Sequence, residues 1–263
     1  MPNINWMDVS QLSFNHLLLL EQVQISWLPG WLPKKELAIA LAANPIVAWY
    51  FCQKHPPSAA WLDEIMSLAE AGEIHDPETV RQAEVTVLKS MVDFMVYATD
   101  PAIYDRQPFL KWDSNELTSV VDFQDKTVID VGAGTGRLAL VAAPLAKVIY
   151  AVEPVGNLRR YLKEKARRQG FGNVYAVDGL ITDIPFSDGF ADVVMGGHVF
   201  GDDPEAEFRE MARVTRPGGR VVLCPGNNDR DDAVHAFLVE HGFAWSRFEE
   251  PQDGIKRKYW KEV

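Results

Sequence analysis

The sequence predicts an α/β protein in which a helical N-terminal region precedes a doubly wound, mostly parallel, seven-stranded sheet. Three observations support this prediction. From residue 126 onward, short β-branched runs alternate with helical stretches, which is the pattern of a parallel sheet covered by helices. A glycine turn follows the first of these runs. Before residue 120, helix signals dominate and no strand pattern is visible. We therefore expect a helical cap over residues 1–120 and a sheet core over residues 121–263.

The N-terminal 120 residues contain helix signals and most of the tryptophans. Asp76-Pro77 is the clearest helix start, because a capping Asp precedes a Pro at the first helical position. We expect this helix to run to about residue 98, and another helix to cover 59–71 and end at Gly72. The loop-like stretch 97–112 is a candidate lid over the substrate, and Tyr104 within it is a candidate catalytic residue.

In the C-terminal region, strands and helices are expected to alternate, except that no helix is expected between the third and fourth strands or between the last two. The expected strands cover residues 127–131, 147–152, 173–177, 191–195, 220–224, 243–249 and 255–261. The expected helices cover residues 136–145, 155–169, 205–215 and 231–241. The turn between the last two strands has hairpin character.

The core is organised around the stretch from residue 127 to residue 140. Apolar, mostly β-branched residues make its first part a buried strand, and Gly132, Gly134 and Gly136 follow at every second position. Glycines let a ligand approach the backbone at a distance that any Cβ would forbid. The helix that follows presents unpaired N–H groups and the positive end of its dipole. This is therefore a nucleotide-type binding turn at the carboxyl end of the first strand.

The glycine spacing distinguishes between classes of nucleotide site. A dinucleotide fingerprint requires glycine at position 137, where Arg137 stands, and a phosphate loop requires a Gly-Lys-Ser/Thr sequence that is absent. The pattern present is acidic-x-G-x-G-x-G, with Asp130 two residues before the first glycine. It resembles the first motif of the class I S-adenosylmethionine (SAM) dependent methyltransferases. The resemblance implies SAM as the cofactor, which would be bound here by Asp130, Gly132, Ala133, Gly134 and Gly136.

Glu153 lies at the carboxyl end of the second expected strand, about 20 residues beyond the glycine turn. A carboxylate in this position accepts both ribose hydroxyls of an adenosine. Enzymes that use SAM and enzymes that use NAD share this feature, so it indicates a nucleoside ligand without choosing between them. Glu153 and the neighbouring Pro154 complete this part of the predicted cofactor site.

The segment from residue 177 to residue 194 resembles a conserved segment of the type 11 methyltransferases, which include the UbiE-like enzymes. Alignment on its Pro-Phe pair places Gly179 on the family glycine, but Leu180 stands where the family has the Asp that binds the adenine amine. We expect the backbone of Leu180 and Ile181, with apolar packing, to bind the adenine edge. Asp178 or Thr182 is the alternative polar contact.

The fourth and fifth expected strands end in further candidate residues. Gly197 is assigned to the cofactor site, and His198 is a candidate general base, with a structural or cofactor-contacting histidine as the alternative. Asn227 and Asn228 are candidate substrate contacts after the fifth strand. Residues 209–223 match the helix–Pro-Gly-Gly–strand segment of the type 11 family.

Composition narrows the classes of partner. The chain of 263 residues has a formal net charge of −11 and no run of Lys and Arg longer than three. This charge argues against nucleic acid and against an anionic membrane surface as partners. The Asn/Asp-Pro-Pro-aromatic motif of nucleic-acid methyltransferases is also missing. The two cysteines have no metal-ligand spacing, so we predict no metal and a reduced, cytoplasmic setting.

The expected function is transfer of a methyl group from SAM to a small or medium-sized acceptor. A non-catalytic SAM-fold binding or regulatory protein is the alternative, and an NAD-dependent oxidoreductase is disfavoured by the glycine spacing. The acceptor, its attacking atom, the need for a general base, the role of the N-terminal helices and the oligomeric state stay open at this point.

Overall fold

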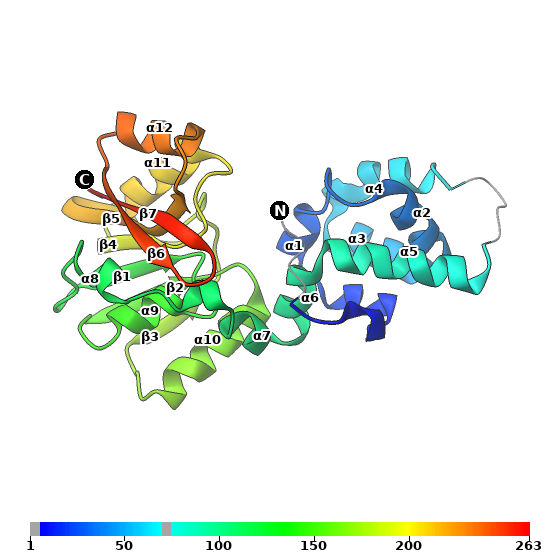
Figure 1. The fold of residues 1–263 in the computed structure, drawn as a ribbon, viewed down its shortest axis with the longest axis horizontal. Coiled ribbons are helices and arrows are strands. Elements are labelled where there is room, and N and C mark those ends of the chain that lie inside the picture. The colour runs from blue at the N-terminus through cyan, green and yellow to red at the C-terminus, as the bar shows by residue number, and fades with distance from the viewer. Residues whose placement is uncertain (1–5, 70–74) are drawn as a thin grey trace. The chain divides into compact units, whose positions relative to one another are not determined.

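The computed structural model describes residues 6–69 and 75–263, and the chain divides into two compact units, Met1–Tyr104 and Asp105–Val263. The two units are drawn in Figure 1. The division falls before residue 105, whereas we expected it at residue 120. Segment 105–120 goes with the C-terminal unit because its side chains bond there: the Asp105 carboxylate accepts hydrogen bonds from Tyr161 Oη at 3.0 Å and Lys165 Nζ at 2.6 Å.

The N-terminal unit is helical, as expected, and has its own buried core. Its α-helices are α1 Gln22–Ser26, α2 Lys34–Ala43, α3 Pro45–Lys54, α4 Ala59–Met66, α5 Pro77–Ser90, α6 Val92–Thr99 and the start of α7 Pro101–Asp105. Short 3-10 helices cover η1 Val9–Gln11, η2 Phe14–Leu19 and η3 Pro56–Ser58. In the part of the chain that the structure describes, no helix is long and apolar enough to cross a membrane.

Two helix predictions for this unit need correction. The helix that begins at Pro77 does not run to residue 98, because Met91 leaves the helical conformation (φ −126°, ψ 36°) and separates α5 from α6. Met91 and the nearby Val87 and Met95 are all fully buried, so packing into the core offsets the break. The helix at 59–71 is α4, Ala59–Met66, and its expected end at Gly72 lies outside the described residues.

The C-terminal unit contains the predicted seven-stranded sheet, in the order β3-β2-β1-β4-β5-β7-β6. The strands are β1 Thr127–Val131, β2 Val148–Val152, β3 Val174–Val177, β4 Ala191–Gly196, β5 Thr215–Asn228, β6 Ala244–Glu250 and β7 Gly254–Glu262. The first five are parallel, while β7 runs antiparallel to β5 and to β6. The doubly wound, mostly parallel fold is thus confirmed. β5 is longer than expected because it includes the Pro-Gly-Gly turn and continues to Asn228.

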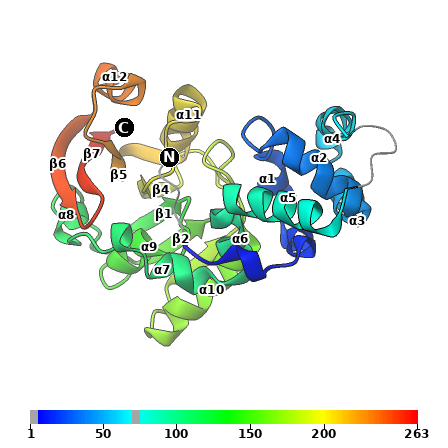
Figure 2. The ribbon, with the colours of Figure 1, turned by 45° about the vertical axis from the view of Figure 1, so that its right-hand side comes forward.

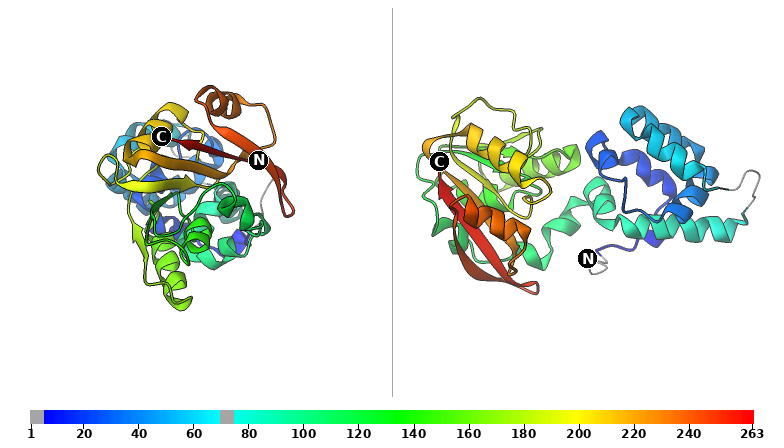
Figure 3. Two further views of the ribbon diagram at one scale, coloured as in Figure 1. Left: turned by 90° about the vertical axis from the view of Figure 1, so that its left-hand side faces the viewer. Right: turned by 90° about the horizontal axis from the view of Figure 1, so that it is seen from above.

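Helices cover both faces of the sheet, as Figures 1 and 2 show. They are α8 Asn115–Thr118, α9 Arg137–Ala142, α10 Gly156–Arg168, α11 Pro204–Val214 and α12 Ala233–Glu240, with η4 Pro108–Leu110 preceding them. Apolar residues of α8, α9 and α10 share one buried cluster with one face of the strands, and those of α11 and α12 share a second cluster with the other face. Figure 3 shows the β6–β7 hairpin, in red, closing the sheet at its C-terminal edge.

The candidate lid at residues 97–112 is not a loop. It comprises the end of α6, then α7 and η4, and it crosses the division between the two units. Trp112, at its end, is 2% exposed and belongs to the core of the C-terminal unit. The short helices arise where Pro101 and Pro108 occupy first helical positions, which proline favours.

Candidate cofactor and active site

The strand order reverses its winding direction at β1 and β4. The chain winds from β1 through β2 to β3 on one side, and β4 then pairs with the other side of β1. In an open parallel sheet, ligands bind at the point where the winding direction reverses. The glycine turn follows β1, and Gly197 and His198 follow β4. The fold therefore places these predicted site residues after the carboxyl ends of two adjacent strands, at the reversal point of the sheet.

The glycine turn requires glycine for two reasons that the structure makes visible. Gly132, Gly134 and Gly136 have φ values of 62°, 53° and 86°, a region that L residues with side chains rarely adopt. A Cβ on Gly132 would also lie 2.4 Å from Cγ2 of Val199, and one on Gly136 would lie 2.9 Å from Cγ of Leu162. Gly132 and Gly136 are therefore needed for packing within the protein, and their role in access by a ligand stays a prediction.

Asp130 fixes the glycine turn to the helix that follows it. The side chain is 1% exposed, and its Oδ2 accepts a hydrogen bond from the backbone N–H of Ala139 in α9 at 2.9 Å. Burial, together with a smaller effect of the nearby Glu153, raises the pKa of Asp130 to about 8. The hydrogen bond from Ala139 acts in the opposite direction. This contact matches the predicted role of orienting the turn; an approach of Asp130 to the SAM ammonium stays a prediction.

Glu153 reaches from the end of β2 to the glycine turn. Its Oε2 accepts the backbone N–H of Gly134 and its Oε1 accepts the N–H of Val155, both at 2.9 Å. The side chain is 5% exposed, and Pro154, the other residue predicted here, is buried to an intermediate degree. Glu153 therefore ties the end of β2 to the glycine turn, and its contact with ribose hydroxyls stays a prediction.

The loop after β3 holds the residues expected at the adenine edge. A Cβ on Gly179 would meet Cδ of Pro185 at 2.7 Å, so this position also requires glycine. The N–H of Leu180 donates to the carbonyl of Asp183 at 3.2 Å, which commits the backbone donor that we had assigned to adenine. The Leu180 side chain is 38% exposed and suits apolar packing, and Ile181 is the remaining candidate backbone donor.

The alternative acid at this edge, Asp178, is held by Arg159. Arg159 Nη1 lies 2.8 Å from Asp178 Oδ1 and also donates to the backbone carbonyl of Glu153 at 2.7 Å. The guanidinium therefore ties the end of β3 to the end of β2. Because the Asp178 side chain is mostly exposed, its second oxygen still faces solvent beside the loop.

At the end of β4, the backbone turns sharply beside β5. A Cβ on Gly197 would lie 2.9 Å from the carbonyl oxygen of Cys224, and His198 follows with a left-handed φ of 57°. The next residue, Val199, packs on Gly132. His198 Nε2 lies 2.9 Å from Oε1 of Glu250, the last residue of β6. No local pattern in the sequence indicates Glu250 as a partner of His198.

Arg137, which excludes a dinucleotide fingerprint, has a structural role of its own. Its guanidinium carbon lies 4.3 Å from the centroid of the Trp112 ring. Its Nη2 donates to the Trp112 carbonyl and its Nη1 to Ser114 Oγ at 3.3 Å. Burial lowers the pKa of Arg137, and the nearby Cys224 and Asp113 oppose this lowering. The side chain thus fixes segment 112–114 to the start of α9.

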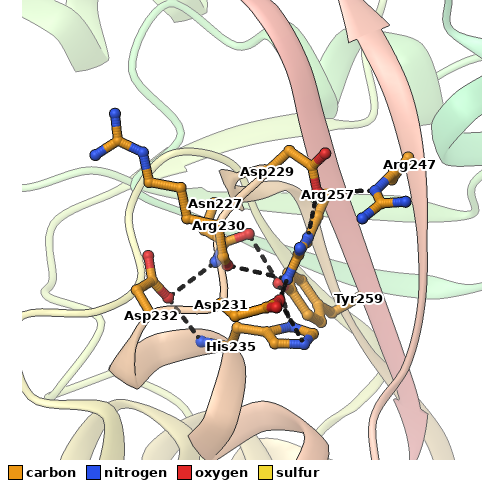
Figure 4. Close-up of polar contacts among 9 residues, drawn as sticks. All are labelled: Asn227, Asp229, Arg230, Asp231, Asp232, His235, Arg247, Arg257 and Tyr259. Carbon is orange, nitrogen blue, oxygen red and sulfur yellow. Dashed lines mark hydrogen bonds and ion pairs between the residues drawn. The ribbon is translucent and has the colours of Figure 1, made fainter.

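The other predicted residues have protein partners. Tyr104, the last residue of the N-terminal unit, packs with Tyr97 and Trp6 at ring distances of 5.3 and 5.5 Å, so the structure places it in an aromatic cluster of that unit. Asn227 accepts a hydrogen bond from Tyr259 Oη at 2.8 Å and donates to Asp232, as Figure 4 shows. Asn228 Oδ1 accepts from Lys256 Nζ at 2.6 Å.

The network in Figure 4 fastens β7 to the loop after β5. Arg257 donates to Asp229 at 2.7 Å and to Asp231 at 2.8 Å, and Arg247 of β6 also donates to Asp229. Hydrogen bonds from Arg247 and Arg257 lower the pKa of Asp229. The C-terminal hairpin is therefore held against the carboxyl end of β5.

Comparison with known proteins agrees with this geometry. Residues 129–223 match the family model described as a methyltransferase domain. This match lies within the C-terminal unit. An uncharacterized protein of Methanocaldococcus jannaschii is 37% identical over 45% of this chain and 40% of its own length. A demethylmenaquinone methyltransferase of Geobacillus kaustophilus is 29% identical over 43% of this chain and 50% of its own length.

The solved structures support the fold. A SAM-dependent methyltransferase from Aquifex aeolicus superposes with a TM-score of 0.51 and 20% identity, covering 62% of this chain and 99% of that one. The chain spans half or less of the length of the two curated relatives described above. The resemblance predicted from the glycine motif is thus confirmed for the methyltransferase domain.

The residues of the methyltransferase domain fit the SAM that this family implies. The Glu153 carboxylate lies against the glycine turn, which carries no Cβ at Gly132, Gly134 or Gly136. When bound, SAM supplies an electrophilic methyl group on a sulfonium. Sequence patterns located the turn, Glu153 and the end of β4. They missed Glu250 and Lys256, whose separation from His198 along the chain leaves no local signal.

Proposed function

We propose that this protein transfers a methyl group from SAM to a small or medium-sized acceptor. The single observation that supports this most is the contact of Glu153 with the N–H of Gly134 at the reversal point of a methyltransferase-domain sheet. This contact puts an acid with ribose-binding capacity directly beside a turn that admits a nucleoside. The glycine spacing favours SAM over NAD.

In this proposal, the chain contributes mainly binding and orientation. Glu153 holds the ribose, the backbone of the turn from Gly132 to Gly136 faces the methionine part of the cofactor, and Leu180 and Ile181 line the adenine. Asp130 keeps the turn in register with α9. Positioning the acceptor in line with the sulfonium and excluding water would supply most of the rate acceleration.

The acceptor and setting follow from charge and composition. A net charge of −11 disfavours nucleic acid and anionic membranes as partners, which leaves a small-molecule acceptor in the cytoplasm as our proposal. The helical N-terminal unit lies wholly outside the family match, which covers residues 129–223, and we propose that it contributes to acceptor selection.

A product assay tests the proposal. The full chain is incubated with SAM and with pools of small phenols, amines, thiols and carboxylic acids, and S-adenosylhomocysteine is quantified by mass spectrometry. We expect acceptor-dependent S-adenosylhomocysteine in at least one pool. Tight SAM binding with no product in any pool would favour the non-catalytic binding protein instead.

A further inference from the structure

His198 is held in a strained and specific position at the end of β4. Its φ of 57° is uncommon for a residue with a side chain, and such conformations cluster at functional sites. Its backbone N–H donates to the carbonyl of Pro225 at 2.9 Å, which fixes the turn against β5. The imidazole remains 32% exposed, so it can meet a ligand.

The partner of the imidazole is a carboxylate from a distant part of the chain. Glu250 Oε1 lies 2.9 Å from His198 Nε2, and the Glu250 side chain is fully buried. A buried carboxylate is stable only when its charge is compensated. Lys256 provides this compensation, because its Nζ lies 3.3 Å from Glu250 Oε2 and its side chain is 5% exposed.

Lys256 is in turn held by two further acceptors. Its Nζ donates to Asn228 Oδ1 and to Asp253 Oδ2, each at 2.6 Å. The hydrogen bond to Lys256 is the main reason why the pKa of Asp253 is lowered, and the nearby His198 adds a smaller effect in the same direction. The groups around the imidazole are thus two acids and one base from the β6–β7 hairpin.

This arrangement selects one tautomer of His198. An ionised Glu250 can only accept hydrogen bonds, so the hydrogen of a neutral imidazole resides on Nε2. Nδ1 then carries the lone pair. The Phe109 ring packs edge-on against the imidazole, with 5.6 Å between the ring centroids. Val199, the residue after His198, packs on Gly132. The basic nitrogen therefore belongs to a turn that packs directly on the cofactor turn.

We infer that His198 is the proton acceptor for a hydroxyl-bearing substrate, and that Glu250, balanced by Lys256, is its positioning residue. This inference rests on the proposed methyl transfer. The hydroxyl proton passes to Nδ1 of His198 while the hydroxyl oxygen bonds to the methyl carbon. The carbon–sulfur bond breaks, and its electron pair stays on sulfur as the sulfonium becomes a thioether. Charge and atoms balance without another reactant.

The chemistry of the base indicates the class of acceptor. A carboxylic acid is already ionised at neutral pH and needs no base, whereas a phenol has a pKa of about 10 and gains from an imidazole. Cys224 is unsuited to act as the base, because burial raises the pKa of its thiol to about 12 and keeps it protonated. A phenolic hydroxyl is therefore the acceptor class that the His198–Glu250 pair serves.

The test compares matched variants on simple probes. The full chain, His198→Asn and Glu250→Gln are assayed with SAM against a series of phenols and a series of benzoates, over a range of pH. Controls are His241→Asn, at the end of α12, and Glu249→Gln, the exposed neighbour of Glu250. Calorimetry measures SAM affinity for each, and circular dichroism verifies folding.

We expect the parent to methylate phenols. In His198→Asn, kcat should fall about 100-fold or more, and the decline of kcat at acidic pH should disappear. Glu250→Gln should lower kcat about 10-fold or more and change the same acidic limb, since it acts through His198. SAM affinity and the two control variants should be unchanged.

Three outcomes would overturn the inference. If His198→Asn keeps the rate and the pH profile of the parent, His198 is not the base, although methyl transfer itself stands. If the parent methylates only benzoates, or no phenol, the assigned acceptor class is wrong. If the parent binds no SAM, the proposed function fails as well. Should Glu250→Gln not fold, nitrogen NMR of the parent decides: a neutral His198 protonated on Nδ1 contradicts the role of Glu250.

Discussion

The Oε2 atom of Glu153 lies 2.9 Å from the backbone nitrogen of Gly134, so the end of β2 is hydrogen-bonded to the turn that follows β1. The glycine turn and Glu153, which the sequence predicted as two separate parts of the cofactor site, are thereby one structural unit. Since Glu153 also accepts the N–H of Val155, a change at Glu153 alters the loops as well as the predicted ribose contact. Variants of the site must therefore be tested for stability and for ligand binding.

Gly132→Ala is expected to destabilise the protein beyond the cost of its backbone conformation. The left-handed φ of 62° costs about 1–2 kcal/mol for a residue with a Cβ, and the overlap with Val199 at 2.4 Å adds about 1–3 kcal/mol. Gly242→Ala is the matched control, because Gly242 has a φ of 79° and open space around it. Urea unfolding measures both free energies.

Adding Val199→Ala to Gly132→Ala should recover the stability lost through the steric overlap. The stability lost through the left-handed φ should remain lost. This double variant separates the two causes. If Gly132→Ala proves no less stable than Gly242→Ala, the Val199 side chain yields easily and the packing role assigned to Gly132 is wrong.

Asp130→Asn is expected to become progressively more stable than the parent as pH rises. Burial raises the folded pKa of Asp130 from 3.8 to about 8, so between these values the folded state binds the proton and the unfolded state does not. Protonation of Asp130 contributes fully to the parent's free energy of unfolding below about pH 4. This contribution is lost as the pH rises to about 8, by up to about 1.4 kcal/mol per pH unit.

Asparagine keeps an acceptor for the N–H of Ala139 and has no such loss. Denaturant unfolding at pH 5, 7 and 8.5 measures the difference, with the exposed Asp202→Asn as control. Parallel pH profiles of parent and Asp130→Asn would show that Asp130 is ionised in the folded protein.

Arg137→Lys is expected to lower the free energy of unfolding by about 1–2 kcal/mol, because lysine has no planar fork to stack on Trp112 while donating to its carbonyl and to Ser114. Arg160→Lys on the exposed side of α10 is the control, with a change within about 0.5 kcal/mol. Equal stability of the two variants, measured by urea unfolding, would mean that Arg137 contributes no more than a surface arginine.

Local patterns predicted the parts of the fold that local chemistry determines. The glycine turn, the acid two residues before it and Glu153 each depend on a strand end and on a residue type that is visible in the sequence. The seven strands were recognised for the same reason, since their apolar runs are bounded by turn residues. Leu180 was recognised as a departure, but the bond between its N–H and Asp183 depends on a loop that no pattern specifies.

Contacts between distant segments could not be predicted. His198 and Glu250 are 52 residues apart, and they meet only because β7 inserts between β5 and β6. Lys256 reads as one charge in a Lys-Arg-Lys run, yet it is buried. The break at Met91 was missed because apolar spacing continues through it, and segment 105–120 was misplaced because its anchors, Lys165 and Arg137, lie in later helices.

The most direct test of the central claim is titration calorimetry of the full chain with SAM, S-adenosylhomocysteine and NAD, in the parent and in Glu153→Ala. Glu164→Ala, an exposed glutamate on α10, is the control. The predicted result is one site for SAM and for S-adenosylhomocysteine, no heat from NAD, and affinity for SAM about 10-fold or more weaker in Glu153→Ala, because hydrogen bonds to a charged group are lost. Equal SAM affinity in Glu153→Ala would contradict the ribose assignment, and absence of SAM binding by the folded parent would contradict the account as a whole.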